Sequence, residues 1–196
     1  MISEKELLIK AKNGDDEAFE EIIKLYQQKI CSTIFYMVKN ENIVEDLAQE
    51  VFIKVYKNIS KFNEESSLYT WIYRITMNTC IDQIKKEKKI TYINTFIDTD
   101  EGEVEIQFED ESQRLDEIIE NKLKKESLVK AIKSLPAEQR ALIVLRDIRQ
   151  FKYMEIAEML KLNLGTVKSK ISRARQTLKE SLEKDGTIVE IDESNV

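Results

Sequence analysis

The segment Tyr153–Arg175 constrains the fold most, because it holds two helical hydrophobic patterns separated by only a short break. Apolar residues recur in both patterns with the i, i+3, i+4 spacing of one helix face. They are Ile156, Ala157 and Leu160 in the first pattern, and Val167, Ile171 and Ala174 in the second. The break covers residues 161–163, and Asn163 is suited to cap the second helix by accepting a backbone N–H of its first turn. The segment therefore predicts a helix-turn-helix.

The second of these helices carries cations and small polar residues outside its apolar stripe. These residues are Thr166, Lys168, Ser169, Lys170, Ser172, Arg173 and Arg175. Lys and Arg neutralise phosphates, and Lys, Arg and Ser can reach base edges in the major groove. The alternative is an ordinary basic face turned to solvent. The turn, the cap and the small residues Gly165, Thr166 and Ala174 occur together, so we expect this helix to bind duplex DNA.

The remainder of the chain is also expected to be helical, because its 196 residues include only 4 Gly and 1 Pro beside abundant Glu, Lys, Ile and Leu. The sequence has no His, and its acids show no pairing with a nucleophile and no metal-ligand spacing. We therefore expect no enzyme, cofactor, metal site or small-molecule substrate. Cys31 and Cys80 fall within helical patterns and are expected to be reduced, packed thiols.

Neither a signal-peptide core nor an apolar run of membrane-spanning length is found in the sequence. We expect a cytoplasmic protein without membrane insertion.

Charge is distributed very unevenly along the chain. Residues 1–92 contain 14 Lys and Arg against 15 Asp and Glu, whereas residues 93–120 contain 1 against 11. Residues 121–184 then contain 16 against 7, and residues 185–196 contain 0 against 4. The net charge of -6 therefore conceals a basic C-terminal region that follows a strongly acidic segment, and it does not exclude nucleic-acid binding.

Four helices are predicted in the N-terminal half. Ser3 and Glu6 form a capping-box pattern, and the first helix should end near Asn13 and Gly14. The second helix should begin at Asp15 or Asp16. Asn42 and Glu45 repeat the capping pattern for the third, and Ser67 should cap a fourth that runs to about Lys88. Core-facing stripes are expected at Phe19, Ile22, Ile23, Tyr26, Ile30 and Ile34, at Val44, Leu47, Val51, Val55 and Ile59, and at Leu68, Trp71, Ile72, Ile75 and Ile81.

The expected fold class is all-α, with two small helical domains joined by an acidic flexible linker. The N-terminal helical bundle is assigned to residues 1–92 and the linker to 93–116, where helical periodicity disappears. The C-terminal helix-turn-helix domain is assigned to residues 117–184, with Pro136 at a helix start, and residues 185–196 form an acidic tail.

Four motifs, in order along the chain, resemble those of bacterial RNA polymerase sigma factors of the extracytoplasmic-function (ECF) type. The resemblance covers roughly residues 10–182. The motifs are Asp46-Leu47-Ala48-Gln49-Glu50-Val51-Phe52, Thr70-Trp71-Ile72-Tyr73-Arg74-Ile75, Leu135-Pro136 with Arg140 and Leu145-Arg146, and Glu155-Ile156-Ala157-Glu158 followed by Gly165-Thr166-Val167-Lys168-Ser169-Lys170. Each motif alone is weak, but four in register over most of the chain are specific.

The resemblance implies particular roles for the motifs. The acidic ridge Asp46, Gln49 and Glu50 would contact the clamp helices of core RNA polymerase, although alone it reads as an ordinary solvated face. The helix from Asn163 onward would read the minus-thirty-five promoter element as duplex, and an anti-sigma factor would be a further partner. The acidic linker would thread the polymerase channel for nascent RNA; a solubilising spacer is the alternative.

In the family, the loop before the fourth helix and that helix itself open the minus-ten element, and the loop captures an extruded base. The corresponding residues here are Phe62, Asn63, Ser66, Ser67, Trp71, Arg74 and Asn78. Trp71 could equally belong to the core, and both interpretations stay open.

The chain departs from the family pattern at three positions. Lys161 stands in a turn where relatives usually place Gly and where a left-handed backbone would cost about 1 kcal/mol. Gln150 and Lys152 stand where a Gly and a Ser-type cap are common.

Competing hypotheses are an ordinary helix-turn-helix transcriptional regulator, and a sigma-like interaction adaptor that no longer melts promoters.

Overall fold

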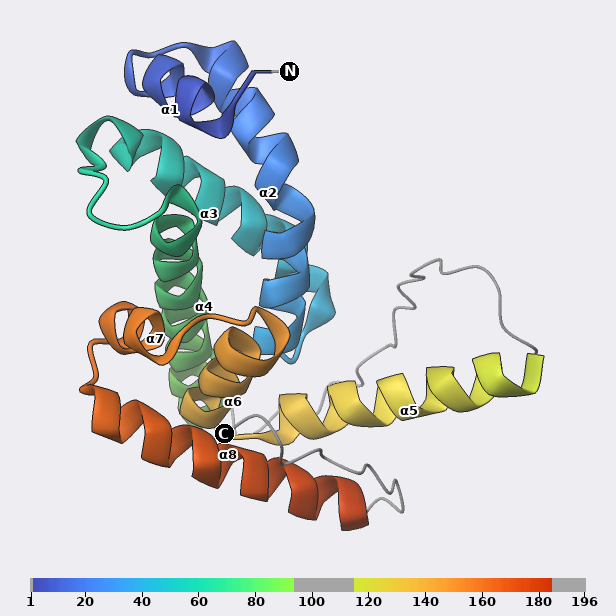
Figure 1. The fold of residues 1–196 in the computed structure, drawn as a ribbon. Helices are drawn as coiled ribbons and strands as arrows, with labels where there is room; N and C mark the ends of the chain where they lie inside the picture. The colour runs from blue at the N-terminus through green and yellow to red at the C-terminus, as the bar shows by residue number, and fades with distance from the viewer. Residues whose placement is uncertain (1, 94–114, 185–196) are drawn as a thin grey trace. The chain divides into compact units, whose positions relative to one another are not determined.

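The computed structural model describes residues 2–93 and 115–184, in which helices are joined by short loops (Figure 1). The N-terminal helices are α1 (Glu4–Lys12), α2 (Asp16–Met37), α3 (Val44–Asn58) and α4 (Leu68–Ile93), with short 3-10 turns η1 (Glu41–Ile43) and η2 (Ile59–Lys61). The C-terminal helices are α5 (Leu115–Ser134), α6 (Ala137–Ile143), α7 (Tyr153–Leu160) and α8 (Leu164–Lys184), with a π-helical turn η3 (Val144–Ile148). Every regular element in the described residues is helical, which confirms the predicted all-α class. The chain divides into two compact units. The predicted acidic linker and acidic tail lie almost entirely outside the described residues.

The first helix begins as predicted. The Ser3 side chain accepts the backbone N–H of Glu6 at 3.3 Å, and the Glu6 carboxylate accepts the backbone N–H of Ser3 at 2.9 Å. These bonds satisfy N–H groups that a helix end leaves unpaired. The chain then turns at Gly14, whose φ of 88° is a conformation that glycine adopts without strain.

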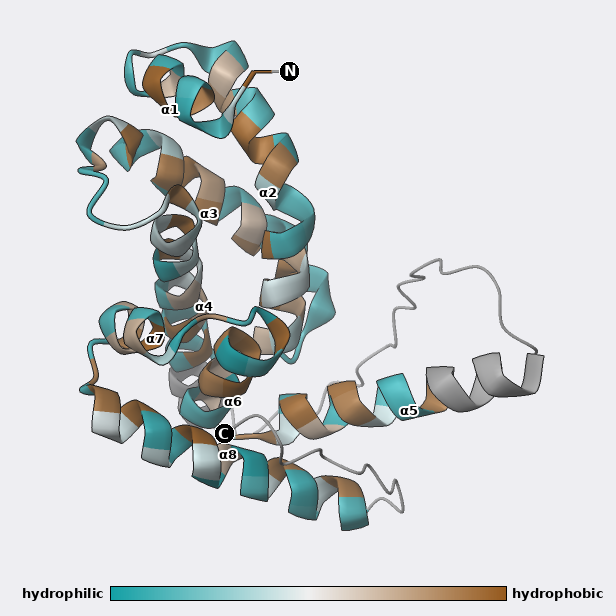
Figure 2. Ribbon diagram, in the orientation of Figure 1, coloured by the Kyte–Doolittle hydropathy of each residue, from teal (hydrophilic) through white to brown (hydrophobic). Residues whose placement is uncertain are grey.

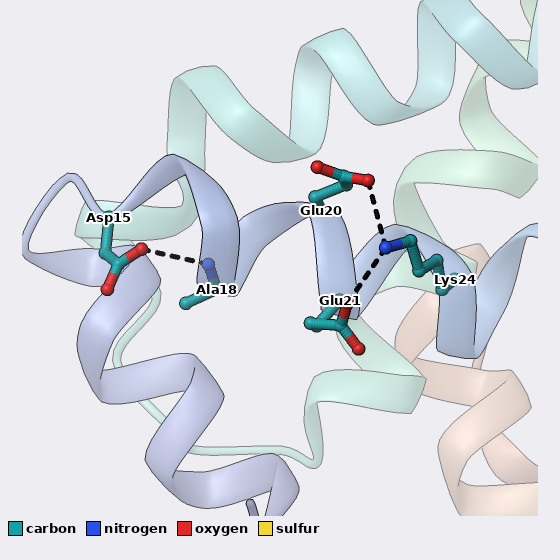
Figure 3. Close-up of polar contacts among 5 residues, drawn as sticks. All are labelled: Asp15, Ala18, Glu20, Glu21 and Lys24. Carbon is teal, nitrogen blue, oxygen red and sulfur yellow. Dashed lines mark hydrogen bonds and ion pairs between the residues drawn. The ribbon is translucent and has the colours of Figure 1, made fainter.

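Helix α2 starts at a side-chain cap and carries an exposed ion-pair cluster on its first turns (Figure 3). Asp15 is the cap, and its carboxylate accepts the backbone N–H of Ala18 at 3.0 Å. The Lys24 ammonium lies 2.9 Å from a carboxylate oxygen of Glu20 and 2.9 Å from one of Glu21. Such solvent-facing i, i+4 and i, i+3 pairs add little to stability, so the cap and the buried stripe are the main determinants of this helix.

The predicted cap of the third helix was wrong. Asn40, and not Asn42, supplies the capping oxygen, which accepts the backbone N–H of Asn42 at 2.9 Å and opens the 3-10 turn η1. This turn runs directly into α3, where the N–H of Val44 already donates to the carbonyl of Glu41. A 3-10 turn at a helix start satisfies the unpaired N–H groups by itself, so α3 begins without a side-chain cap.

The core of the N-terminal unit lies where the apolar stripes of α2, α3 and α4 meet. Figure 2 shows these helices with apolar and polar faces. Most of the predicted stripe residues are buried, namely Phe19, Ile22, Tyr26, Ile30, Ile34, Val44, Leu47, Val51, Val55, Ile59, Leu68, Trp71 and Ile72, whereas Ile23, Ile75 and Ile81 are half-buried. Tyr73 and Met77 of α4 are also fully buried and were not predicted. Helix α4 continues beyond the predicted end at Lys88 to Ile93.

Helix α1 is fastened to the bundle by packing and by one polar contact. Leu7, Leu8 and Ala11 are its buried residues, and the helix packs on α2. The Tyr26 hydroxyl donates to a carboxylate oxygen of Glu4 at 2.6 Å. Burial, together with this carboxylate, raises the pKa of Tyr26 well above its ordinary value, so the hydroxyl remains a donor to Glu4 even in alkaline solution.

The C-terminal unit is built around α8, against which α5 and α6 pack. Its buried side chains are Ala131, Ile132, Leu135, Ala141, Leu142, Ile143, Val144, Leu145, Phe151, Ile156, Val167, Ile171, Ala174, Leu178 and Leu182. Pro136 precedes α6, as predicted. The buried Arg140 donates from Nη2 to the carbonyl of Leu135 at 2.9 Å, which satisfies an acceptor at the end of α5. The recognition-type helix α8 is thus held along one whole side.

Candidate nucleic-acid and polymerase interface

The helix-turn-helix is present in α7 and α8, with the connection that the sequence predicts. Asn163 caps α8 by accepting the backbone N–H of Thr166 at 2.7 Å. Lys161 adopts a left-handed backbone with φ 53°, and the N–H of Leu162 donates to the carbonyl of Ala157 at 2.9 Å. This is the arrangement that ends many helices on a left-handed residue, usually Gly. The departure noted at Lys161 therefore carries real backbone strain.

A second left-handed residue precedes α7. Gln150, where the family commonly has Gly, has φ 59°. At Lys152, where a Ser-type cap is common, the backbone N–H donates instead to the Glu155 carboxylate at 2.8 Å. In a capping box this bond runs from the backbone N–H of the cap residue to the side chain three residues later, and it needs no hydroxyl at the cap. Helix α7 can therefore begin normally with Lys at position 152. The Arg146 guanidinium lies 4.6 Å from the Tyr153 ring centroid and donates to the carbonyl of Phe151 at 3.1 Å, which fixes the entry to the motif.

Helix α8 separates into an anchored face and an exposed face as predicted. Val167, Ile171 and Ala174 are fully buried, whereas the side chains turned to solvent are those of Lys168, Ser169, Ser172 and Arg173. The Ser169 hydroxyl also donates to the carbonyl of Thr166 at 3.1 Å. A helix held by one apolar side presents its cations at fixed spacing, which suits insertion into a DNA major groove.

Two of the predicted DNA-contacting cations, Lys170 and Arg175, are paired with carboxylates of the same unit. Lys170 Nζ lies 2.6 Å from Glu138 Oε2, and the Arg175 guanidinium binds Asp147 through two hydrogen bonds of 2.6 and 3.3 Å. The Lys170 ammonium lowers the pKa of Glu138, and the Asp147 carboxylate raises the pKa of Arg175. The first pair ties α8 to α6, and the second ties α8 to η3.

Sequence reasoning missed these partners because Glu138 and Asp147 stand 32 and 28 residues earlier in the chain. Any contact of Lys170 or Arg175 with DNA stays a prediction.

The acidic ridge predicted on the third helix lies on α3. Asp46 and Gln49 are exposed, and Glu50 pairs with Lys54 at 2.7 Å. One turn further, Ile53 leaves 53% of its surface in solvent. Residues at this spacing share one helix face, so the face combines polar residues with an exposed apolar side chain. The sequence signal for Ile53 was an apolar residue outside the core stripe.

The loop before α4, residues Phe62–Ser67, is the predicted minus-ten loop. Its Asn63 is exposed and Ser66 is half-buried. Ser67 caps α4 as predicted, since its hydroxyl accepts the backbone N–H of Thr70 at 3.0 Å. On α4 itself, the predicted contact residues Arg74 and Asn78 are half-buried and exposed.

The structure places Phe62 and Trp71 in the core rather than on the loop surface. Trp71 is 8% exposed and Phe62 is 3% exposed, and their ring centroids lie 5.0 Å apart. Of the two interpretations of Trp71, packing is therefore the one seen here, while a direct DNA contact stays a prediction. Lys12 of α1, which sequence reasoning missed, donates to the carbonyl of Phe62 at 2.8 Å.

Three other features bear on the function of the described residues: the cysteine thiols, metal-binding groups and membrane-spanning helices. Cys31 and Cys80 are both free thiols, as predicted, and Cys80 is fully buried. Within 2–93 and 115–184 no group of three or more His, Cys, Asp and Glu side chains is arranged to hold a metal ion. None of the helices in that part of the chain has the length and apolarity needed to cross a membrane.

Comparison with known proteins defines the class of this chain. Residues 22–90 match the family model of sigma-70 region 2, and residues 125–178 match that of sigma-70 region 4. The first match covers most of α2, all of α3 and most of α4, and the second covers α7 and most of α8. The chain is thus built as a sigma-70-type protein.

Relatives narrow the class to one family. The chain is 33% identical over 179 residues to the ECF RNA polymerase sigma factor SigW of Bacillus subtilis, covering 91% of this chain and 96% of that protein. It is 31% identical over 183 residues to the ECF RNA polymerase sigma-E factor of Escherichia coli K12, covering 90% and 93%. The protein belongs to the ECF family of RNA polymerase sigma factors, which are DNA-binding regulators of transcription.

Solved structures have the same fold. The sigma factor RpoE of Bartonella quintana, solved in complex with the anti-sigma factor NepR, matches with a TM-score of 0.68 and 24% identity over 85% of this chain and 98% of that chain. CnrH, solved with the cytosolic domain of CnrY, matches with a TM-score of 0.63 and 20% identity, covering 91% and 96%.

Proposed function

We propose that this sigma factor directs promoter-specific initiation by dividing the work between its two units. Residues 1–92 would bind core RNA polymerase and open the minus-ten element, and residues 117–184 would read the minus-thirty-five element as duplex. The observation that carries the proposal is the two-sided construction of α8. Its buried Val167, Ile171 and Ala174 hold a face that exposes Lys168 and Arg173. Cations on a rigid helix are what phosphate contact and base readout need.

The predicted reading face comprises Thr166, Lys168, Ser169, Lys170, Ser172, Arg173 and Arg175. Its cations are not equivalent, because Lys168 and Arg173 are exposed whereas Lys170 and Arg175 must leave or share a carboxylate to reach phosphate. We expect the exposed pair to supply most of the salt-dependent affinity, since each phosphate contact releases condensed counterions.

The test is an Arg173→Ala variant beside Lys179→Ala as a matched control. Both residues are exposed cations of α8, but Lys179 lies beyond the predicted reading face. Arg173→Ala should still bind core polymerase and should lose initiation at promoters that need the minus-thirty-five element, whereas Lys179→Ala should retain it. Promoter use by Arg173→Ala equal to that of the wild type would refute the assignment.

Contact with core polymerase is assigned to Asp46, Gln49 and Glu50, with Ile53 as an apolar centre on the same face. An exposed apolar residue among polar ones is typical of a protein interface, where burial supplies affinity and charges supply orientation. Asp46→Arg should weaken binding to core polymerase. Glu45→Arg is the control, because the Glu45 carboxylate acts on the Cys31 thiol and so lies toward α2. Equal binding by the two variants would argue against this face.

Opening of the minus-ten element is assigned to the Phe62–Ser67 loop and α4. Asn63, Ser66 and Ser67 offer hydrogen bonds to an extruded base, and Arg74 and Asn78 extend the surface along α4. Flipping a base costs a few kcal/mol of lost stacking. The contacts that the loop makes with the flipped base must therefore contribute a comparable binding free energy. The buried pair of Phe62 and Trp71 supports the loop from beneath.

Further partners and the setting follow from the family. We propose that an anti-sigma factor masks the protein until a signal arrives, since a sigma factor of the same fold has been solved bound to an anti-sigma factor. Because a sigma factor acts on core polymerase and promoter DNA, we propose that this protein acts in the cytoplasm. This role requires no catalytic activity and no cofactor. The acidic segment before α5 would occupy the polymerase channel for nascent RNA.

One experiment tests the whole proposal. The protein is mixed with bacterial core polymerase on genomic DNA of its host, and the 5′ ends of the transcripts are sequenced. Discrete start sites that depend on the protein, with a shared upstream sequence, are expected. Transcripts that do not depend on it would refute sigma activity.

A further inference from the structure

Lys12, near the end of α1, reaches across to the predicted minus-ten loop. Its ammonium donates to the backbone carbonyl of Phe62 at 2.8 Å and to a carboxylate oxygen of Glu64 at 3.0 Å. The same Nζ lies 5.9 Å from the centroid of the Phe62 ring. The Lys12 side chain is only 26% exposed and its bond to the Phe62 carbonyl is partly buried, whereas the Glu64 side chain is 49% exposed and its ion pair faces solvent. A charge-assisted hydrogen bond that is partly buried is stronger than a surface ion pair, so the bond to the Phe62 carbonyl is the stronger of the two contacts.

The loop itself needs such a hold. Glu64 has φ 60°, a left-handed conformation that a residue with a Cβ adopts at a cost and keeps only when its surroundings enforce it. The two ends of the loop are anchored within the N-terminal unit: the N–H of Phe62 donates to the carbonyl of Ile59, and Ser67 caps α4. Between these anchors, Lys12 holds one backbone carbonyl and the side chain of the strained residue at once.

We propose that Lys12 is a positioning residue for promoter opening, which makes α1 part of the minus-ten machinery. The inference rests on the proposed function of the loop. Lys12 touches no base in this role. It keeps the loop in the conformation that receives an extruded base, with Asn63 and Ser66 on the open side and Phe62 packed on Trp71. When Lys12 is lost, the loop samples other conformations, and the apparent affinity for the flipped base falls in proportion to the fraction of loops that keep the competent conformation.

The first arm of the test needs no DNA. Trp71 is the single tryptophan of the chain, and its ring packs on Phe62, whose carbonyl Lys12 holds. Lys12→Met should therefore raise acrylamide quenching of the tryptophan fluorescence and shift its emission to the red. Lys10→Met is the matched control, because Lys10 is an exposed lysine of the same helix. Equal quenching in wild type, Lys12→Met and Lys10→Met would overturn the proposal.

The second arm measures promoter opening by the full chain with core polymerase, followed by 2-aminopurine fluorescence in the minus-ten element. Lys12→Met should slow opening roughly ten- to hundredfold, the range expected for loss of a charged hydrogen bond, while binding of core polymerase is unchanged. It should also flatten the preference among promoters that differ at the captured base, which a general loss of stability would not do. Lys12→Arg, which keeps the charge and the donors, should restore much of the activity.

A charge-exchange pair strengthens the second arm. Lys12→Glu and Glu64→Lys should each be defective, and the double variant should recover part of the opening rate if the ion pair shapes the loop.

The outcomes distinguish failure of the proposed sigma function from failure of the role of Lys12. A wild-type protein that opens no promoter with core polymerase would overturn the proposed function and the role of the loop together. Normal opening and unchanged base preference in Lys12→Met, with an active wild type, would overturn the role of Lys12 alone.

Discussion

Replacing Ile171 by alanine should remove a large part of the stability of the C-terminal unit. Ile171 is 1% exposed on the side of α8 that is packed in the unit. Truncating a buried Ile to Ala typically costs about 2–5 kcal/mol, because the lost burial is joined by an unfilled cavity. Alanine returns roughly 0.4 kcal/mol through its higher helix propensity. The net loss of about 2–4 kcal/mol compares with roughly 3–10 kcal/mol for the total stability of a unit of about 70 residues.

Urea denaturation followed by circular dichroism measures this loss. With a slope of about 1–2 kcal/mol per molar urea for a small unit, the midpoint of its transition should fall by roughly 1–4 M. Ser172→Ala is the matched control, since Ser172 is the exposed neighbour of Ile171 and the replacement adds helix propensity without opening a cavity. Fluorescence of Trp71 follows the N-terminal unit, in which this side chain is buried.

The functional consequence follows from the same construction of α8. As the unit unfolds on warming, Ile171→Ala should lose binding to minus-thirty-five duplex at a temperature where Lys179→Ala, an exposed change on α8 beyond the reading face, still binds. If the midpoint of Ile171→Ala shifted no further than that of Ser172→Ala, the anchoring of α8 by its apolar face would be wrong.

Four further outcomes are expected. Asn163→Ala should lower the free energy of unfolding by about 1 kcal/mol through loss of the α8 cap, and an unchanged urea midpoint would count against that cap. Lys161→Gly should instead raise it by up to about 1 kcal/mol, because relief of the left-handed strain exceeds the chain entropy that glycine adds; a fall would contradict the strain argument. Burial raises the pKa of Cys80 to about 12, so only about one thiol in ten thousand is ionised at pH 8, and mass spectrometry should find alkylation of Cys31 first, although its pKa is also raised. Rapid labelling of native Cys80 would show that it is not buried. Lys168→Ala should lower the slope of log affinity for duplex against log salt by about 0.9, and an unchanged slope would remove Lys168 from the phosphate contacts.

Local features of this chain could be predicted from sequence because their partners are close in the chain. The caps at Ser3, Asp15 and Asn163 each bind an N–H three residues later. Where two local solutions compete, the prediction failed: Asn40 and its 3-10 turn displaced the expected cap at Asn42. A sequence pattern does not reveal which of two similar caps the chain adopts. The two caps differ in free energy by less than the packing of the surrounding side chains contributes.

The site was predicted in part. Exposure of Lys168, Ser169, Ser172 and Arg173 followed from helical periodicity alone. The pairing of Lys170 and Arg175 did not, because their carboxylates come from other helical segments of the unit. The same reason explains why Lys12 was missed, as its partners stand 50 and 52 residues away.

The amino-acid sequence by itself determined that this protein is helical, that its charge is concentrated in particular segments, and that its second half carries a basic helix after a tight turn. These properties depend on periodicity, composition and caps, which act over one or two helical turns. Only the tertiary structure decided that Trp71 packs on Phe62, and that Lys12 holds the loop next to them. Such contacts join helices distant in sequence, and they form only where the buried faces of those helices bring the chain together.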